Sequence, residues 1–285
     1  MLIPSQFART SWSPTPIIVY PIQQTSPNRG APTVAFIYFA FNIGIFKLHH
    51  STHYHLRSEF LFFTHPPASP TPNSSTPSIM EKLPPRVEAF LGRLLRNKRG
   101  RDAKLLTRIS PAIQALPPTI VVTSPVGPSP APLPQEYTPL GENHFPPLSW
   151  TVPSDITPDQ INSYVLIVED PDAPLPSPIV HGLYYAIPKD KTTVSSEDVV
   201  LADTAKRTLQ GGFQYGVNWH QNVWSGPRPV LGHGPHRYFF QLLVLGQPLA
   251  GVGEKPLGKG ELLEALGKSD VLAWGEWVGT FVRDP

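Results

Sequence analysis

Short apolar runs separated by turn residues make up most of the chain after residue 110. The runs lie at residues 119–123, 147–150, 164–170, 179–187, 236–245 and 271–282. The run at 164–170 (YVLIVED) is apolar at odd and even positions until its last two residues, which is typical of a strand buried on both faces. One short helical segment, residues 260–266, stops at Gly267. Several strands without alternating long helices predict a sandwich rather than a parallel α/β sheet.

Residues 80–109 have a different pattern, which predicts a basic amphipathic helical segment. Its apolar positions at helical spacing are Val87, Phe90, Leu91, Leu94 and Leu95. Pro84 and Pro85 suit the start of a helix, and Gly100 interrupts it. Such a helix binds an anionic membrane or an acidic partner, or it packs its apolar stripe on the neighbouring domain. The packing arrangement is the commoner one, and we expect it here.

Residues 1–79 do not have the pattern of a folded domain. They combine Pro/Ser/Thr tracts with an apolar run, residues 33–46, that is shorter than the roughly 20 residues of a membrane span. We expect a disordered extension, or a spurious one preceding a true start at Met80, and a cytoplasmic protein. A mitochondrial transit segment is the alternative. Four histidines (His49, His50, His53 and His55) form a biased tract that we do not assign to a metal.

Composition and charge narrow the classes of function. The 37 prolines disfavour long helices, and the absence of cysteine excludes disulfides, thiolate nucleophiles and cysteine-bound zinc. Residues 81–108 carry a net charge of +6, whereas residues 109–285 carry −7. A mildly acidic domain therefore follows a basic segment, which argues against a nucleic-acid partner.

Polar residues stand at the ends of three of the apolar runs. They occur in the segments DPDAP (Asp170–Pro174), VHGLYYAIP (Val180–Pro188) and GPRPVLGHGPHRYFF (Gly226–Phe240). Each has an ordinary structural explanation when taken alone, because Asp170 suits a turn, His181 a satisfied core position and Tyr238 core packing. Their occurrence together is the informative observation.

Taken together, these three segments resemble the motifs of the phosphatidylethanolamine-binding protein family, in family order, over roughly residues 110–285, in the style of fungal members. The resemblance implies an all-β domain, mainly an antiparallel Greek-key β-sandwich with a few short peripheral α-helices. It also implies a small cavity that takes phosphate-like or carboxylate anions and, by extension, a phospholipid head group. The matching ligand positions are Asp170, His181, Gly226, Pro227, His236 and Tyr238.

Three further residues are expected to contact the ligand-binding residues rather than the ligand itself, namely Asp172, Pro174 and Arg237. We predict a charge-assisted hydrogen bond between Asp172 and Arg237 that fixes one motif against another. Histidine donors and a tyrosine hydroxyl suit an oxyanion, and Asp170 suits an imidazolium or an ammonium group. Backbone amides freed by the Gly226–Pro227 turn are expected to add donors.

The sequence therefore predicts a binding protein, with a regulatory or inhibitory role, rather than an enzyme. We assign no catalytic residue, metal ligand or cofactor. The expected partners are a small anion or phospholipid head group, a protein such as a protease or kinase, and the membrane periphery. An acid–base enzyme of isomerase or cyclase type that uses the same histidines and aspartate is one alternative, and an inhibitor of a serine carboxypeptidase is another. A serine hydrolase is not indicated, because Ser225 lacks the G-x-S-x-G turn.

Overall fold

The computed structural model describes residues 36–37, 48–49, 83–250 and 256–285. The chain divides into two units, residues 1–69 and residues 70–285. In the first unit, β1 (Phe36–Ile37) pairs antiparallel with β2 (Leu48–His49). The expectations for the rest of residues 1–80, including the transit segment and the start at Met80, lie outside the described residues. The boundaries placed at residues 80 and 110 stay predictions.

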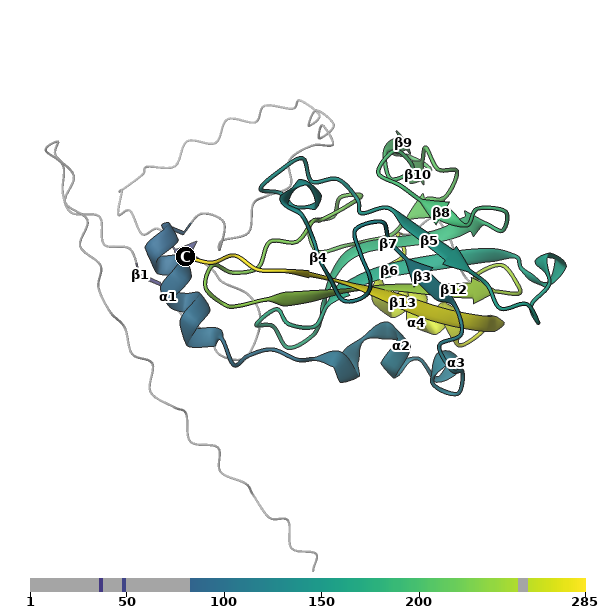
Figure 1. Ribbon diagram of the computed structural model, residues 1–285, viewed down its shortest axis with the longest axis horizontal. Coiled ribbons are helices and arrows are strands. Elements are labelled where there is room, and N and C mark those ends of the chain that lie inside the picture. The colour runs from purple at the N-terminus through teal and green to yellow at the C-terminus, as the bar shows by residue number, and fades with distance from the viewer. Residues whose placement is uncertain (1–35, 38–47, 50–82, 251–255) are drawn as a thin grey trace, which may run out of the picture. The chain divides into compact units, whose positions relative to one another are not determined.

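An eight-stranded sheet is the centre of the second unit (Figure 1). From edge to edge its strands are β4 (Ala131–Pro132), β13 (Val271–Phe281), β12 (His236–Leu245), β6 (Ser163–Asp170), β7 (Ile179–Pro188), β11 (Gln214–Tyr215), β10 (Thr208–Leu209) and β9 (Leu201–Asp203). Neighbouring strands are antiparallel except β4 and β13, which are parallel. The four long strands, β6, β7, β12 and β13, correspond to the four longest apolar runs of the sequence.

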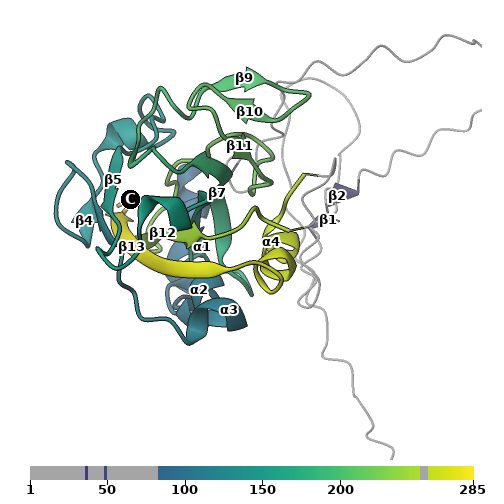
Figure 2. The same ribbon diagram turned by 90° about the vertical axis from the view of Figure 1, so that its right-hand side faces the viewer.

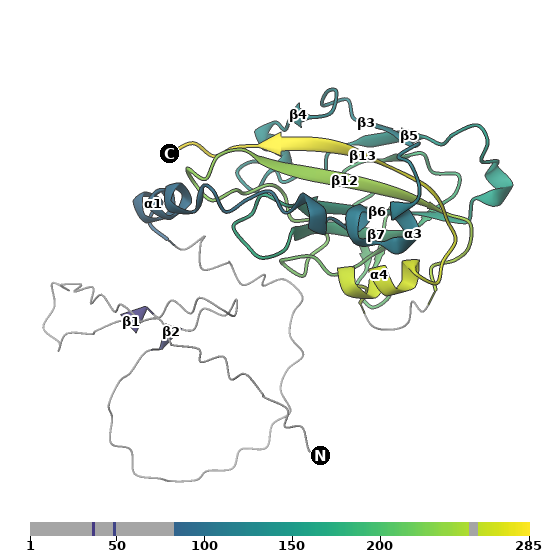
Figure 3. The same cartoon turned by 90° about the horizontal axis from the view of Figure 1, so that it is seen from below.

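Each face of the large sheet is covered by a different layer. A small antiparallel sheet of β3 (Val121–Thr123), β5 (Leu148–Thr151) and β8 (Thr193–Val194) lies on one face. The other face carries three helices, α2 (Leu106–Ile109), α3 (Pro111–Gln114) and α4 (Lys259–Leu266), as Figures 2 and 3 show from two sides. The predicted all-β class, with antiparallel sheets and a few short helices, is confirmed.

Strand β6 explains why the large sheet is buried on both sides. Its even-numbered residues, such as Leu166 and Val168, belong to the core shared with the small sheet, whereas Val165 and Ile167 belong to the core beneath the helices. Every residue of β6 is buried, as its apolar pattern predicts. Burial of each large aliphatic side chain contributes about 1.5–3 kcal/mol, so this strand anchors both layers.

The predicted basic helix is present, but it is shorter than the predicted segment, residues 80–109, and a different side of it faces the domain. Helix α1 spans Pro85–Leu95, and Gly100 (φ +77°) separates it from a 3₁₀ turn, η2 (Asp102–Lys104), and from α2. The expectation that its apolar stripe packs on the domain is wrong for Val87, Phe90 and Leu94, which are exposed, whereas Leu91 and Leu95 are partly buried. Its buried side consists of Glu88, Ala89 and Gly92.

The surface beneath α1 explains this orientation. Glu88 forms an ion pair with Arg283 (2.6 Å), close to the carboxyl end of the chain (Figure 1). Gly92 lies so close to the carbonyl oxygen of Leu231 that a Cβ atom there would be 2.1 Å from it. A charged residue and a glycine meet this polar surface better than leucine or phenylalanine would. Within the described ranges, no helix is long and apolar enough to cross a membrane.

Candidate ligand-binding site

The strand register brings the three sequence motifs to one end of the large sheet. Strand β12 runs antiparallel to β6, and Phe239 pairs with Glu169, so the last residue of β6, Asp170, lies beside the first residues of β12. On the other side Asp170 pairs with Ile179 of β7, which places His181 at the same end. Residues separated by up to 66 positions thus meet because of strand pairing.

Asp170 is the centre of the cluster and is 3% exposed. Its Oδ1 atom accepts hydrogen bonds from the backbone N–H groups of Asp172 (2.7 Å) and Ala173 (3.1 Å), which closes the turn after β6. Its Oδ2 atom accepts a bond from Nδ1 of His236 (2.8 Å) and lies 4.0 Å from Nε2 of His181. The carboxylate is therefore held rigidly between two histidines.

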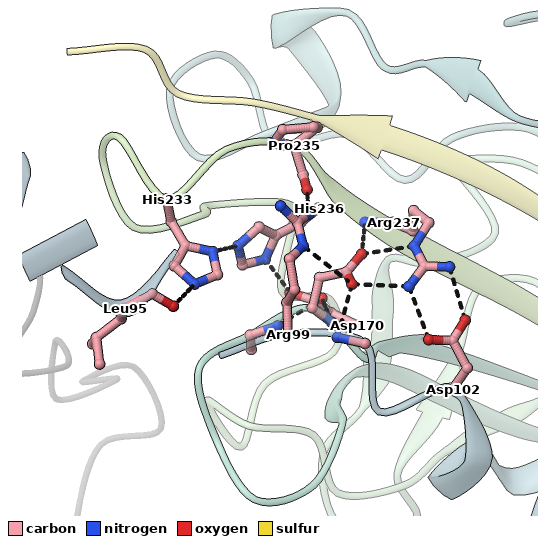
Figure 4. Close-up of polar contacts among 11 residues, drawn as sticks. Leu95, Arg99, Asp102, Asp170, His233, Pro235, His236 and Arg237 are labelled. Carbon is pink, nitrogen blue, oxygen red and sulfur yellow. Dashed lines mark hydrogen bonds and ion pairs between the residues drawn. The ribbon is translucent and has the colours of Figure 1, made fainter. Parts of the chain in front are cut away.

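A chain of hydrogen bonds runs from Asp170 through two histidine rings to helix α1. Nε2 of His236 is 2.7 Å from Nδ1 of His233, and Nε2 of His233 is 2.9 Å from the carbonyl oxygen of Leu95, as Figure 4 shows. Both ring nitrogens of His236 are thus occupied. His236 holds Asp170 in place and has no free nitrogen for a ligand.

This chain of contacts needs one proton more than two neutral imidazole rings supply. Each of the contacts requires a hydrogen, and a neutral ring carries one. The carbonyl of Leu95 only accepts, so Nε2 of His233 must donate. Asp170 and the two histidines together therefore carry no net charge. Burial and the charge of the neighbouring His236 lower the pKa of His233.

His181 presents an unoccupied acceptor to the cluster. It is 7% exposed, and its Nδ1–H group donates to the carbonyl oxygen of Ser225. Burial lowers the pKa of His181, although the charge of Asp170 opposes this, so the ring is neutral and Nε2 carries a lone pair. That Nε2 atom is buried and has no hydrogen-bond partner among the described residues.

Tyr238 contributes a second buried polar atom without a partner. The side chain is fully buried, and its hydroxyl makes no hydrogen bond to any described residue. Its ring lies edge-on to that of His181, with the ring centres 5.0 Å apart. Burial raises the pKa of Tyr238 well above its ordinary value, and the charge of Asp170 adds to this, so the hydroxyl keeps its proton.

The predicted bond between Asp172 and Arg237 is present. Nε of Arg237 donates to Oδ2 of Asp172 (2.8 Å) and Nη2 donates to Oδ1 (2.9 Å), while the guanidinium also pairs with Asp102 (Figure 4). Burial opposes ionisation of Asp172, but the hydrogen bonds and charge of Arg237 outweigh it and lower the pKa of Asp172. The turn after β6 is thereby tied to the start of β12.

The remaining predicted positions lie at the border of the cluster. Gly226 and Pro227 follow Ser225, whose carbonyl orients His181. The N–H of Gly226 donates to Oδ1 of Asn143 (3.1 Å), and Pro227 has no N–H, so neither residue offers a free donor. The expectation that their backbone amides add donors to the site is wrong. Pro174 is half-buried and directly follows the turn closed by Asp170.

Sequence reasoning missed His233 and Ser225 as members of the site. Gly232 (φ +74°) and Gly234 (φ +98°) flank His233 with backbone conformations that favour glycine, and they turn its ring toward His236. The G-x-G spacing around a second histidine in GHGPHR was the available signal. Ser225 pairs with Nδ1 of His220, and its carbonyl carries the contact to His181. In the part of the chain that the structure describes, no group of three or more histidine or acidic side chains is arranged to hold a metal ion.

The model of the phosphatidylethanolamine-binding protein family matches residues 123–282. The chain belongs to this family. All three motifs lie inside the matched residues, whereas α1, which reaches the site through Leu95, lies before them. Helix α1 therefore lies outside the residues that the family model matches.

Two fungal relatives are similar to this chain over most of their own length. Phomoidride biosynthesis cluster protein B of Talaromyces stipitatus is 38% identical over 214 residues, which cover 74% of this chain and 86% of the relative. The protein of the same name from a fungal species (strain ATCC 74256) is 36% identical over 200 residues, 68% of this chain and 93% of the relative. Among solved structures, a putative phosphatidylethanolamine-binding protein homolog from Chlamydia trachomatis is 27% identical, with 59% of this chain and 100% of that chain covered and a TM-score of 0.47.

Proposed function

We propose that this protein binds a small oxyanion, such as phosphate or the phosphorylated head group of a phospholipid, between His181, Tyr238 and Asp170. The observation that carries the proposal is the pair of buried, unpartnered polar atoms, Nε2 of His181 and the hydroxyl of Tyr238. A buried polar group without a partner costs about 1–3 kcal/mol. A ligand that supplies both partners recovers that free energy.

Binding of an oxyanion requires His181 to gain a proton. In the free protein its Nε2 atom is an acceptor, because the pKa of the ring is lowered by burial. An oxyanion favours the protonated ring, whose Nε2–H then donates to it, and the negative charge of the oxyanion balances the new positive charge. The affinity should therefore rise as the pH falls, because protonation of His181 is coupled to binding.

Calorimetric titration of the full chain tests this proposal with three probes: inorganic phosphate, phosphoethanolamine and sulfate. Sulfate keeps its charge between about pH 5 and pH 8, so any pH dependence of its affinity belongs to the protein. We expect binding that tightens toward acid pH. Tyr238→Phe should weaken it by about tenfold or more, since a hydrogen bond to a charged group contributes about 1.5–3 kcal/mol.

Tyr185→Phe is the matched control, because Tyr185 lies in the core on the helix-covered face of the sheet. Its affinity should equal that of the wild type. The proposal fails if none of the probes binds at about 10 mM. At this concentration, binding with a free energy of about −3 kcal/mol is detectable. It also fails if the two tyrosine variants weaken binding equally. Preference for phosphoethanolamine over phosphate would indicate a head group rather than a free ion.

The free lone pair of His181 favours a second candidate, acid–base catalysis on a small substrate. A neutral imidazole with a lowered pKa, oriented by Ser225 and next to a carboxylate, has the features of a general base. The two fungal relatives are named for a biosynthesis cluster, which fits an enzyme of small-molecule metabolism.

Proton NMR separates this candidate from simple binding. The probe is isomerisation of 3-butenoate to crotonate, which moves one proton within a small carboxylate. A catalyst should show turnover that His181→Gln abolishes, while the variant keeps its far-UV circular dichroism. Binding of the anions above without any turnover of this probe would favour the binding function.

A further inference from the structure

Helix α1 displays its apolar row outward. Val87, Phe90 and Leu94 are 43%, 64% and 68% exposed. They stand three and four residues apart, so they lie on one side of the helix, one above the other. An exposed row of this kind marks an interaction surface.

The opposite side of α1 is fixed to the domain by specific contacts. Glu88 pairs with Arg283 and Arg228, and its carboxylate also accepts the backbone N–H of Leu231 (3.2 Å). The close approach of Gly92 to the same loop leaves no space for a rotated helix with a larger residue at that point. The outward direction of the apolar row therefore follows from how the helix is held.

The charge around this row has one sign. Arg86 and Arg93 are exposed on α1, and Arg96 and Lys98 are exposed immediately after it. On a helix of 3.6 residues per turn, Arg86 and Arg93 flank the apolar row on one side. Residues 81–108 carry +6 in a chain whose next 177 residues carry −7, so the positive charge is concentrated in the segment that contains this helix.

We propose that α1 is a membrane-surface helix that docks on an anionic lipid bilayer. Phe90 and Leu94 enter the boundary between head groups and acyl chains, and Arg86 and Arg93 lie along the lipid phosphates. A row of aromatic and aliphatic residues flanked by arginine matches this depth profile, because arginine reaches the head groups with its charged end while its stem stays apolar. The inference does not depend on the oxyanion site, which uses other residues.

Cosedimentation of the full chain with vesicles tests the proposal. The vesicles contain phosphatidylcholine alone or with about one third phosphatidylserine. We expect binding to the anionic vesicles that falls with added salt. The double variant Phe90→Gln and Leu94→Gln should lose at least about tenfold in affinity. Arg86→Gln and Arg93→Gln should each lose about fivefold.

The matched control is Val200→Gln with Leu201→Gln, which removes two exposed apolar residues (44% and 40%) from the far edge of the sheet. It should bind like the wild type. The proposal is overturned if the wild type does not bind anionic vesicles, or if the α1 variants bind as well as the control. It is also overturned if the α1 double variant instead abolishes a dimer seen by light scattering, because the row would then face a second copy of the chain. Titration with sulfate, which contains no lipid, reports on the oxyanion site separately.

Discussion

Asp170 and Asp172 stand two residues apart in one turn and have different roles. Asp170 contacts histidines, which exchange protons near neutral pH, whereas Asp172 contacts Arg237, which stays charged. The first aspartate therefore belongs to the part of the site that responds to pH and ligand. The second is a fixed anchor between β6 and β12. One short motif combines both roles because Asp170 is the last residue of β6 and Asp172 lies in the turn that follows it, so their side chains meet different partners.

We expect Asp172→Asn to lower the free energy of unfolding by about 3 kcal/mol, as removal of one partner of a buried ion pair does. Asp172 is 1% exposed and accepts bonds from Arg237 and from the backbone N–H of Gly100. Urea denaturation followed by tryptophan fluorescence measures the loss.

Asp102→Asn is the control for that change. Asp102 is the other partner of Arg237, but its side chain is 43% exposed, so its ion pair is solvated. Its replacement should cost less than about 1 kcal/mol. Equal losses in the two variants would show that burial does not distinguish these pairs.

At the scale of elements, α1 shows how one helix uses two different faces. Its docked face is made of a charged residue and small residues, and its free face is made of large apolar ones. A glycine inside a helix normally weakens it by about 0.5–1 kcal/mol relative to alanine. Gly92 is retained where the loop at Leu231 approaches the helix backbone.

Gly92→Ala should therefore destabilise the docked helix, although the same change is favourable in an ordinary helix. The added Cβ atom would lie 2.1 Å from the carbonyl oxygen of Leu231, so either the loop or the helix must move. We expect a loss of about 1–3 kcal/mol. Faster amide hydrogen exchange throughout α1 measures the undocking.

Gly260→Ala in α4 is the matched control, since no atom lies within 4 Å of the position that its Cβ would occupy. This variant should be unchanged or more stable by up to about 1 kcal/mol. The same sign of effect for both alanine variants would contradict the close contact at Gly92.

At the scale of the whole molecule, buried histidines couple stability to pH. Burial lowers the pKa of His181 below its ordinary value of 6.5, against the attraction of Asp170 and with added repulsion from His220 and His236. The unfolded chain thus takes up a proton that the folded chain does not. This contribution is favourable above about pH 6.5 and is lost as the pH falls below it. Asp172, whose pKa is lowered, adds a further loss only at more acid pH.

We expect the free energy of unfolding to fall between about pH 7 and pH 5, with a slope of up to about 1.4 kcal/mol per pH unit from His181. Urea denaturation at several pH values measures the slope. His181→Gln should flatten it, whereas His144→Gln, which changes an exposed histidine, should leave it unchanged. An unchanged slope in His181→Gln would exclude His181 as the source.

The sequence by itself determined the long strands and the residues that meet at their ends. Runs such as residues 164–170 and 236–245 are apolar at odd and even positions over most of their length, and burial on both faces satisfies such a pattern. The ion pair of Asp172 and Arg237 was also predictable, because each lies within a motif and their charges are opposite. These features depend on the types of residues that are neighbours along the chain, which the sequence shows directly.

Only the tertiary structure decided which atoms are free and which face of α1 is buried. The acceptor on His181 is free, and His236 is fully engaged, because His233 approaches from a loop turned by two glycines. The apolar row of α1 is exposed because the surface beneath it offers Arg283 and a backbone loop. Periodicity shows that a helix has an apolar face. It does not show what that face meets, since this depends on residues nearly 200 positions away.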